Sequence, residues 1–269
     1  MNTQLGYRFE LLNPSVRCHQ YDRYMHSMQK LRARVYLRDG AIRASQVTPE
    51  GRYCVARDDE SWHFLLIDDQ DEVAGCVRYL LHPNTVDFSD LLLRHSALAQ
   101  HPVWGPQLRA AVARDLEQAR THDLRYAELG GWALAEEYRG STAALKILLA
   151  SYAWGRLIGG CICSCTATVR NNSASILRRI GGVSLKFDTV ALPPYEDPLY
   201  GCTMEILRFD SRSAPTRYEA TIRSLQIEMQ EAALFTSNLL HLGTALATAN
   251  PVVLSTPETA TLRVVPLTA

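Results

Sequence analysis

The chain has 269 residues, of which 47% are hydrophobic and 21% charged, and its formal net charge is +0. Such a chain can bury one sizeable core, and without a basic excess it is not expected to bind nucleic acid. No stretch reaches the about 18 consecutive apolar residues of a membrane span. Residues 1–10 include Arg8 and Glu10 rather than a signal-peptide core, so we expect a cytoplasmic protein with no integral membrane span.

The first third of the chain predicts a helix, a long loop and a β-hairpin. The helix is predicted over Gln20–Arg34. Residues 39–61 hold scattered Gly, Pro, Asp and Arg with little periodicity, which indicates a surface loop of the kind that often forms a lid or binding segment. Two strands follow, over Trp62–Ile67 and Val73–Leu81, and an acidic turn joins them.

Two helices are predicted next, over Asp87–Ala99 and Pro106–His122. Their apolar residues, which include Leu91, Leu98 and Leu108, offer more apolar surface than an acetyl group needs. They either line an elongated acyl pocket or pack against the sheet in the ordinary way.

Three of the seven cysteines, Cys161, Cys163 and Cys165, alternate along an apolar run. On a strand all three point to the same face. A metal site would need spaced pairs or a histidine partner, and neither is adjacent. We therefore predict buried thiols packed under a helix, and no metal.

A strand, a turn and a helix between residues 127 and 158 outline a site for pyrophosphate. Residues 127–134 form an apolar run of strand length, and Ser141–Ile158 carries apolar residues at helical spacing. The turn between them lies at a helix N-terminus, where free N–H groups and the helix dipole favour an anion.

Beyond residue 212 the composition changes. Ala214–Ala247 repeats apolar residues at helical spacing, and residues 248–269 are rich in Thr, Pro and Val. The apolar face can pack on the core, pair with a second copy in a homodimer, or line an acyl tunnel.

The strand–turn–helix resembles the acyl-donor loop of the GNAT acyltransferase superfamily, which runs Arg/Gln, two residues, Gly, one residue, Gly/Ala. Arg139 takes the first place and Ala144 the last, while Thr142 stands where the family has a Gly. The turn that begins at Asn171 and the helix that ends near Gly182 also match the superfamily.

The front half resembles one branch of GNAT proteins, the acyl-homoserine-lactone synthases and N-acyl amino acid synthases. Arg34 would fall on the Arg before a Val-Phe/Tyr pair, Arg78 on the Arg that closes a Gly-Cys-x-Arg strand, and Glu128 on the Glu before the donor loop. The branch's Glu-x-x-Arg is absent because Gly131 takes the place of its Arg, which leaves the amine substrate open.

These resemblances, with the chemistry of acyl transfer, assign candidate site residues. Glu128 is the expected proton acceptor, because it is the single acid in an apolar strand; alternatively it is solvated or paired with an Arg. Tyr195 and Tyr200 are candidates to protonate the departing thiolate of the donor, and we predict Tyr200 for this role. The candidate donor contacts are Leu134, Arg139, Gly140, Ser141, Thr142, Ala143, Ala144, Asn171 and Ser173, and the candidate substrate contacts are Arg34, Arg78, Gly130 and Trp132.

The resemblance implies an α/β fold of GNAT type, with a mixed, centrally splayed β-sheet flanked by helices and a C-terminal helical extension. Residues 1–212 would form the acyltransferase domain and residues 213–269 the extension. The expected activity is transfer of a medium or long acyl chain from acyl-CoA or acyl-ACP, with no permanently bound cofactor, to a small-molecule amine such as an amino acid. The alternatives are an acetyl-CoA-dependent N-acetyltransferase and a catalytically silent GNAT fold that binds an acyl thioester or a partner. An acyl carrier protein is a candidate partner, for which arginines 32, 34, 38 and 43, or 178 and 179, would supply a basic patch.

Overall fold

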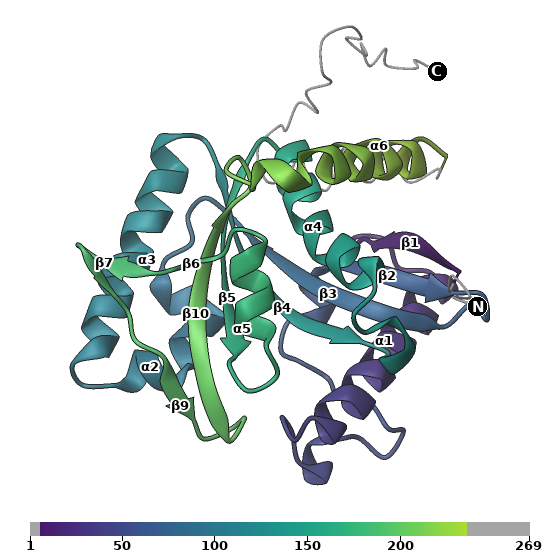
Figure 1. Cartoon of the computed structure of the whole chain (residues 1–269), viewed down its shortest axis with the longest axis horizontal. Coiled ribbons are helices and arrows are strands. Elements are labelled where there is room, and N and C mark those ends of the chain that lie inside the picture. The colour runs from purple at the N-terminus through teal and green to yellow at the C-terminus, as the bar shows by residue number, and fades with distance from the viewer. Residues whose placement is uncertain (1–5, 236–269) are drawn as a thin grey trace, which may run out of the picture.

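The structure, a computed structural model, describes residues 6–235 and is built around an eight-stranded sheet (Figure 1). The strand order is β1-β2-β3-β4-β5-β10-β6, and β9 pairs with β10. Strands β4 and β5 run parallel, whereas the other described pairings are antiparallel. The strands are β1 (Tyr7–Leu12), β2 (Trp62–Asp68), β3 (Val73–His82), β4 (Arg125–Leu134), β5 (Cys161–Thr168), β6 (Val183–Ser184), β9 (Tyr195–Asp197) and β10 (Cys202–Asp210); β7 (Lys186–Phe187) and β8 (Val190–Ala191) form a separate hairpin.

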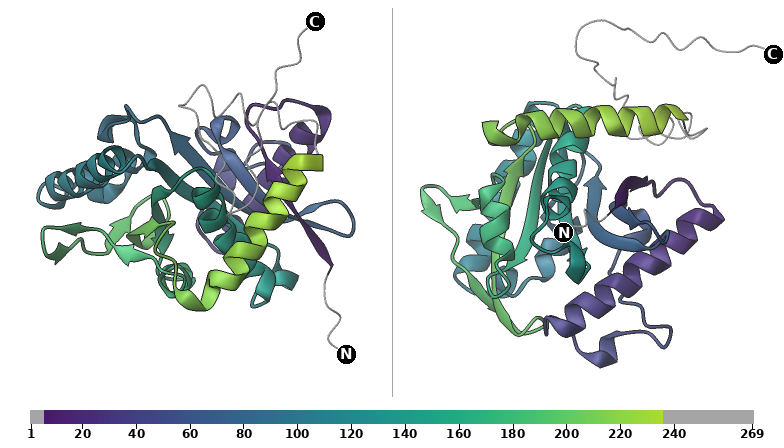
Figure 2. Two further views of the ribbon diagram at one scale, coloured as in Figure 1. Left: turned by 90° about the horizontal axis from the view of Figure 1, so that it is seen from above. Right: turned by 45° about the vertical axis from the view of Figure 1, so that its right-hand side comes forward.

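Helices cover both faces of the sheet (Figure 2). Helices α1 (His19–Arg38) and α3 (Trp104–Thr121) lie on one face, and α4 (Thr142–Leu157) and α5 (Ser173–Arg179) on the other. Helix α6 (Glu219–Phe235) packs across α4. The GNAT-type, mixed α/β architecture expected from the sequence is therefore confirmed.

The β2–β3 hairpin and the start of α4 form where the sequence predicts them. The Asp68 carboxylate accepts hydrogen bonds from the backbone N–H groups of Gln70 and Glu72, which closes the hairpin turn. The Ser141 hydroxyl accepts a hydrogen bond from the N–H of Ala143 and so caps α4. Both elements depend on contacts within a few residues, which local sequence specifies.

The single helix predicted over Asp87–Ala99 is wrong. The segment consists of two 3-10 helices, η3 (Phe88–Asp90) and η4 (Leu92–His95), and a short helix α2 (Ala97–Gln100). The side chains of Asp87 and Ser96 cap separate turns. The N–H groups of Leu92 and Leu93 bond to a side chain of β4, so an α-helix cannot continue through them.

Two apolar cores lie against the sheet. The larger one includes Cys161, Cys163 and Cys165, which are buried as predicted and pack with residues of α4. The smaller core holds the apolar side chains of the segment between β3 and β4, including Leu91, Leu98 and Leu108, packed against β5, β9 and β10. These side chains fill space between elements, which agrees with the ordinary packing alternative.

Only part of the predicted C-terminal extension falls within the described residues. Helix α6 buries Ile222, Leu225 and Met229. The Arg156 guanidinium of α4 donates two hydrogen bonds, of 2.7 and 3.0 Å, to the Glu219 carboxylate. Residues 236–269, and the rest of the predicted helix with them, lie outside the described residues, and the domain boundary at residue 212 stays a prediction. None of the described helices is long and apolar enough to cross a membrane.

Candidate active site

Strands β4 and β5 separate halfway along their length. Their ladder runs from the Arg125–Cys161 pair to the Leu129–Cys165 pair. Beyond it β4 continues along β3, with a register shift between Cys76 and Arg78, and Gly131 adopts a φ of 63°. The backbone of residues 130–134 therefore presents an edge toward β5, at which the polar groups of a ligand can pair.

Arg78 of β3 pairs with Gly130 of β4, at the point where β4 separates from β5. Its side chain is buried, and its Nη1 donates to the Ala56 carbonyl at 2.9 Å. Its Nε is buried and has no hydrogen-bond partner among residues 6–235. A Cβ atom added to Gly130 would lie 3.3 Å from Arg78 Nη2. Burial lowers the pKa of Arg78, although Asp58 acts in the opposite direction. The site thus holds a desolvated cation with unused hydrogen-bonding capacity.

A buried ion pair lies beside Arg78. The Arg32 guanidinium of α1 is 0% exposed and donates to the two Asp58 carboxylate oxygens at 3.0 and 2.7 Å. Burial alone would raise the pKa of Asp58, but Arg32 lowers it below the usual value. Asp58 also accepts from the N–H of Val55 at 3.0 Å, and its carbonyl contacts His63 Nε2 at 2.7 Å. The pair fastens the long loop of residues 39–61 onto α1.

Three tyrosines converge on the same region. The Tyr36 hydroxyl donates to the Trp132 carbonyl at 3.1 Å, and the Tyr36 ring meets the edge of the Tyr53 ring at 5.7 Å between centroids. Tyr200, the predicted thiolate acid, interacts electrostatically with Tyr53 and Arg78. Burial raises the pKa of Tyr200, which keeps its hydroxyl protonated and makes it a weaker acid.

Glu128, the predicted proton acceptor, is buried. It lies two residues before Gly130 on β4, opposite Leu80 of β3, and so faces the same side of the sheet as Arg78. Its carboxylate accepts from the backbone N–H groups of Leu92 at 2.8 Å and Leu93 at 2.7 Å, and it contacts His82 Nε2 at 2.9 Å. It is therefore neither solvated nor paired with an arginine as the alternative had it.

The predicted donor loop connects β4 to α4. Gly140 has a φ of 74°, a conformation that suits glycine, and Ser141 donates to the Tyr138 carbonyl at 2.6 Å while it caps α4. Thr142 is exposed, Ala143 is buried and Ala144 is half-buried. Leu134 is buried at the end of β4, so its backbone rather than its side chain is the part available to a donor.

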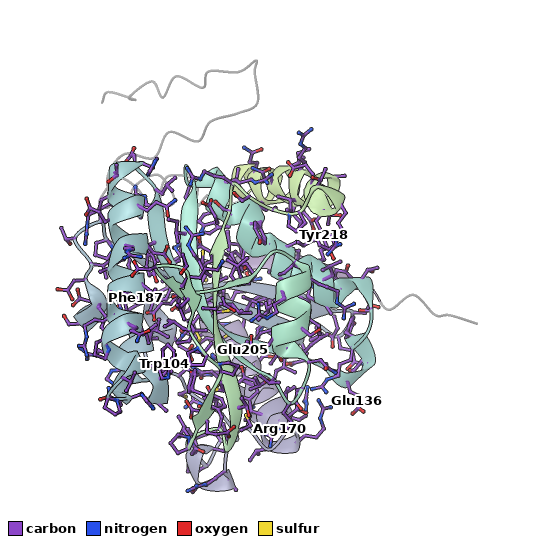
Figure 3. The ribbon with its side chains drawn as sticks, turned by 60° about the vertical axis from the view of Figure 1, so that its left-hand side comes forward. Trp104, Glu136, Arg170, Phe187, Glu205 and Tyr218 are labelled. Carbon is purple, nitrogen blue, oxygen red and sulfur yellow. The ribbon has the colours of Figure 1, made fainter. Side chains whose placement is uncertain are left out.

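Arginines from three elements meet at Asp39, next to this loop. Arg139 donates to the Asp39 carboxylate at 2.9 Å, Arg170 to the Asp39 carbonyl at 2.9 Å, and Arg38 to Glu136 at 3.1 Å. Figure 3 shows Glu136 and Arg170 at the same end of the molecule. The cluster thus places three guanidinium groups beside the donor loop, where they can contact an anion.

The other predicted donor contacts, Asn171 and Ser173, follow β5. Asn171 is exposed, whereas Ser173 begins α5 and its hydroxyl accepts from Thr168 Oγ1 at 3.3 Å. Both residues flank the side of β5 that has separated from β4, so they are placed where a donor between the strands would pass.

Of the arginines on α1, Arg32 rather than Arg34 belongs to the buried cluster, and the role of Arg34 as a substrate contact stays a prediction. Arg34 is exposed and lies outside the buried cluster, whereas Arg32, two residues earlier, is its centre. Residues two apart on an α-helix differ by about 200° in direction, so they cannot share a face. Asp58, Tyr53 and His82 were also missed; none has a local motif, since each reaches the site only through the tertiary fold.

A separate cavity of about 630 Å³ opens over α2 and α3 and shares no lining residue with the cluster around Arg78. Its position away from the separated strands argues against a role in acyl transfer. Its lining is Asp87, Phe88, Ser89, Arg94, His95, Ala99, Gln100, Arg109 and Ala113.

Comparison with known proteins agrees with this architecture. The family model described as an acetyltransferase (GNAT) domain matches residues 31–149. No curated protein matches the chain. A solved CoA-dependent acyl-homoserine lactone synthase, BjaI, with MTA is 13% identical with a TM-score of 0.53, over 84% of this chain and 90% of that one. The AHL synthase LasI is 15% identical with a TM-score of 0.51, over 80% of this chain and 94% of that one. At these identities the likeness extends to the fold.

Proposed function

We propose that this chain, which is a GNAT-type N-acyltransferase by the domain match over residues 31–149, acylates the amine of a small molecule that carries a carboxylate, such as an amino acid. The observation that carries the proposal is the Arg78 guanidinium, which is buried beside Gly130 and whose Nε has no partner in the part of the chain that the structure describes. An acceptor carboxylate would supply the missing anion and hold the amine near the separated strands.

The donor is proposed to be acyl-CoA or acyl-ACP. Its pyrophosphate or phosphate would bind the N–H groups at the start of α4, and the arginine cluster around Asp39 would add positive charge. The thioester would lie against residues 130–134, whose backbone N–H groups can stabilise the oxyanion. Because the front half of the chain resembles the acyl-homoserine-lactone and N-acyl amino acid synthases, we propose a medium or long acyl chain.

The reaction has a defined proton balance. The acceptor ammonium first loses one proton to become a nucleophile, and the nitrogen loses a second as the C–N bond forms and the C–S bond breaks. The departing thiolate takes up one proton and the other reaches solvent. We propose Glu128 as the acceptor of the amine proton and Tyr200 as the donor to the thiolate.

The test compares amino acids with the matching amines that lack the carboxylate, for example tyrosine with tyramine, using acetyl-CoA, octanoyl-CoA, hexadecanoyl-CoA and an acyl-ACP as donors. The wild-type protein should acylate tyrosine in preference to tyramine, and Arg78→Met should lose that preference. Arg109→Met, a change of an exposed arginine on α3, is the matched control. Equal use of both amines by the wild type would contradict a carboxylate site at Arg78.

The donor series also separates the alternatives. Turnover with acetyl-CoA alone would identify a short-chain acetyltransferase. Binding of donors without turnover of any amine would identify a silent GNAT fold, for which Thr142 in the donor loop is the sequence feature. A cytoplasmic location stays a prediction.

A further inference from the structure

A buried histidine contacts the proposed proton acceptor from behind. His82 of β3 is 2% exposed, and its Nε2 lies 2.9 Å from Glu128 Oε2. The surrounding core is apolar and includes Leu93 and Tyr126. We propose that His82 is a positioning residue, which selects the oxygen of Glu128 that accepts the amine proton. This inference rests on the proposed function.

The direction of the hydrogen bond follows from the chemistry of the carboxylate. An ionised carboxylate can only accept hydrogen bonds, so His82 Nε2 must carry the proton while Glu128 is charged. This assignment of the donor follows from the acceptor-only chemistry of the carboxylate and holds for either charge of the imidazole. A buried imidazole and a buried carboxylate each satisfy the other's requirement for a partner.

The donors are unequally shared between the two carboxylate oxygens. Oε2 accepts from His82 Nε2 and from the Leu92 N–H at 2.8 Å, whereas Oε1 accepts from the Leu93 N–H at 2.7 Å. Each carboxylate oxygen has two acceptor positions. Oε2 is therefore fully occupied, and with respect to the described residues the remaining acceptor position of the carboxylate is on Oε1.

The free position on Oε1 is where a proton can arrive. The acceptor amine, or a water bonded to it, would give its proton to Oε1, which converts Glu128 to the neutral acid. The proton then leaves from Oε1 to solvent, and His82 keeps its own proton throughout. Without His82, Oε2 gains a free acceptor position and the carboxylate loses one of three restraints, so the base is displaced from the amine.

The test uses His82→Leu, which removes the donor, and His82→Gln, whose amide can donate to the same oxygen. We expect kcat of His82→Leu to fall about tenfold to a hundredfold with KM little changed, and His82→Gln to restore it to within about threefold. Tyr126→Phe is the matched control, because it removes a buried hydroxyl that bonds Ser164 Oγ at 3.1 Å on the same face. Rates are expressed per folded molecule, measured well below each variant's Tm.

A double-variant cycle distinguishes positioning from general destabilisation. If His82 acts through Glu128, adding His82→Leu to Glu128→Gln should lower the residual rate no further. An additive loss, or a folded His82→Leu protein with wild-type kcat, would overturn the proposal. If the leucine variant does not fold, His82→Asn, whose shorter amide cannot reach Oε2, takes its place.

The wild-type protein in the same experiment separates the two proposals. Turnover by the wild type with no effect at His82 would overturn the role of His82 alone. Absence of turnover with every donor would overturn the proposed function, and the role of His82 with it.

Discussion

The buried Arg32–Asp58 pair gives a sharp stability prediction. Asp58→Asn keeps the shape of the side chain but removes the only carboxylate that bonds the Arg32 guanidinium among the described residues. Because Arg32 is 0% exposed, water cannot replace the lost charge. Leaving one member of a buried pair without its partner destabilises a protein by about 3–5 kcal/mol. We therefore expect the free energy of unfolding of Asp58→Asn to fall by about 3 kcal/mol or more.

Urea unfolding at pH 7 measures this loss, and Asp71→Asn is the control. Asp71 also bonds two arginines, Arg8 and Arg23, but its side chain is 42% exposed, so its removal should change stability by less than about 1 kcal/mol. Replacing both buried partners, in Arg32→Met/Asp58→Leu, should recover most of the stability. A loss below about 1 kcal/mol in Asp58→Asn would refute the argument that the Arg32 charge is desolvated.

Three further predictions concern the same region. Burial and Arg32 lower the pKa of His63 from 6.5 to about 4, so the unfolded chain binds a proton at a higher pH than the folded chain does. The free energy of unfolding should therefore fall by about 3 kcal/mol between pH 7 and pH 4. Denaturation at both pH values should show this loss in the wild type and not in His63→Leu. Gly131→Ala meets side-chain atoms at 3.3 Å as well as a positive φ, whereas Gly51→Ala has the positive φ in open space. The loss of Tm and of kcat should therefore be larger at Gly131, and equal losses would exclude crowding as the cause. Tyr36→Phe removes the 3.1 Å hydrogen bond to the Trp132 carbonyl. We expect the free energy of unfolding to fall by about 1 kcal/mol and kcat/KM to decrease. Unchanged kinetics would show that this bond does not hold the edge of β4 for catalysis.

Local sequence determined the elements whose stabilising contacts lie within a few residues. The acidic turn between β2 and β3 is closed by the Asp68 carboxylate, and the start of α4 is capped by Ser141. The alternation of Cys161 and its neighbours placed their thiols on one buried face. Each of these features follows from periodicity or from capping, and both can be recognised without the fold.

Tertiary structure decided which residues form the candidate site. The choice of Arg32 over Arg34 depends on which face of α1 meets the sheet, and Asp58 reaches Arg32 from a loop 26 positions along the chain. The β3–β4 register brings His82 into reach of Glu128. The Glu128 carboxylate in turn takes the N–H groups that a continuous helix over residues 87–99 would have needed. Such contacts join residues far apart in sequence, and only the packed sheet determines their distances.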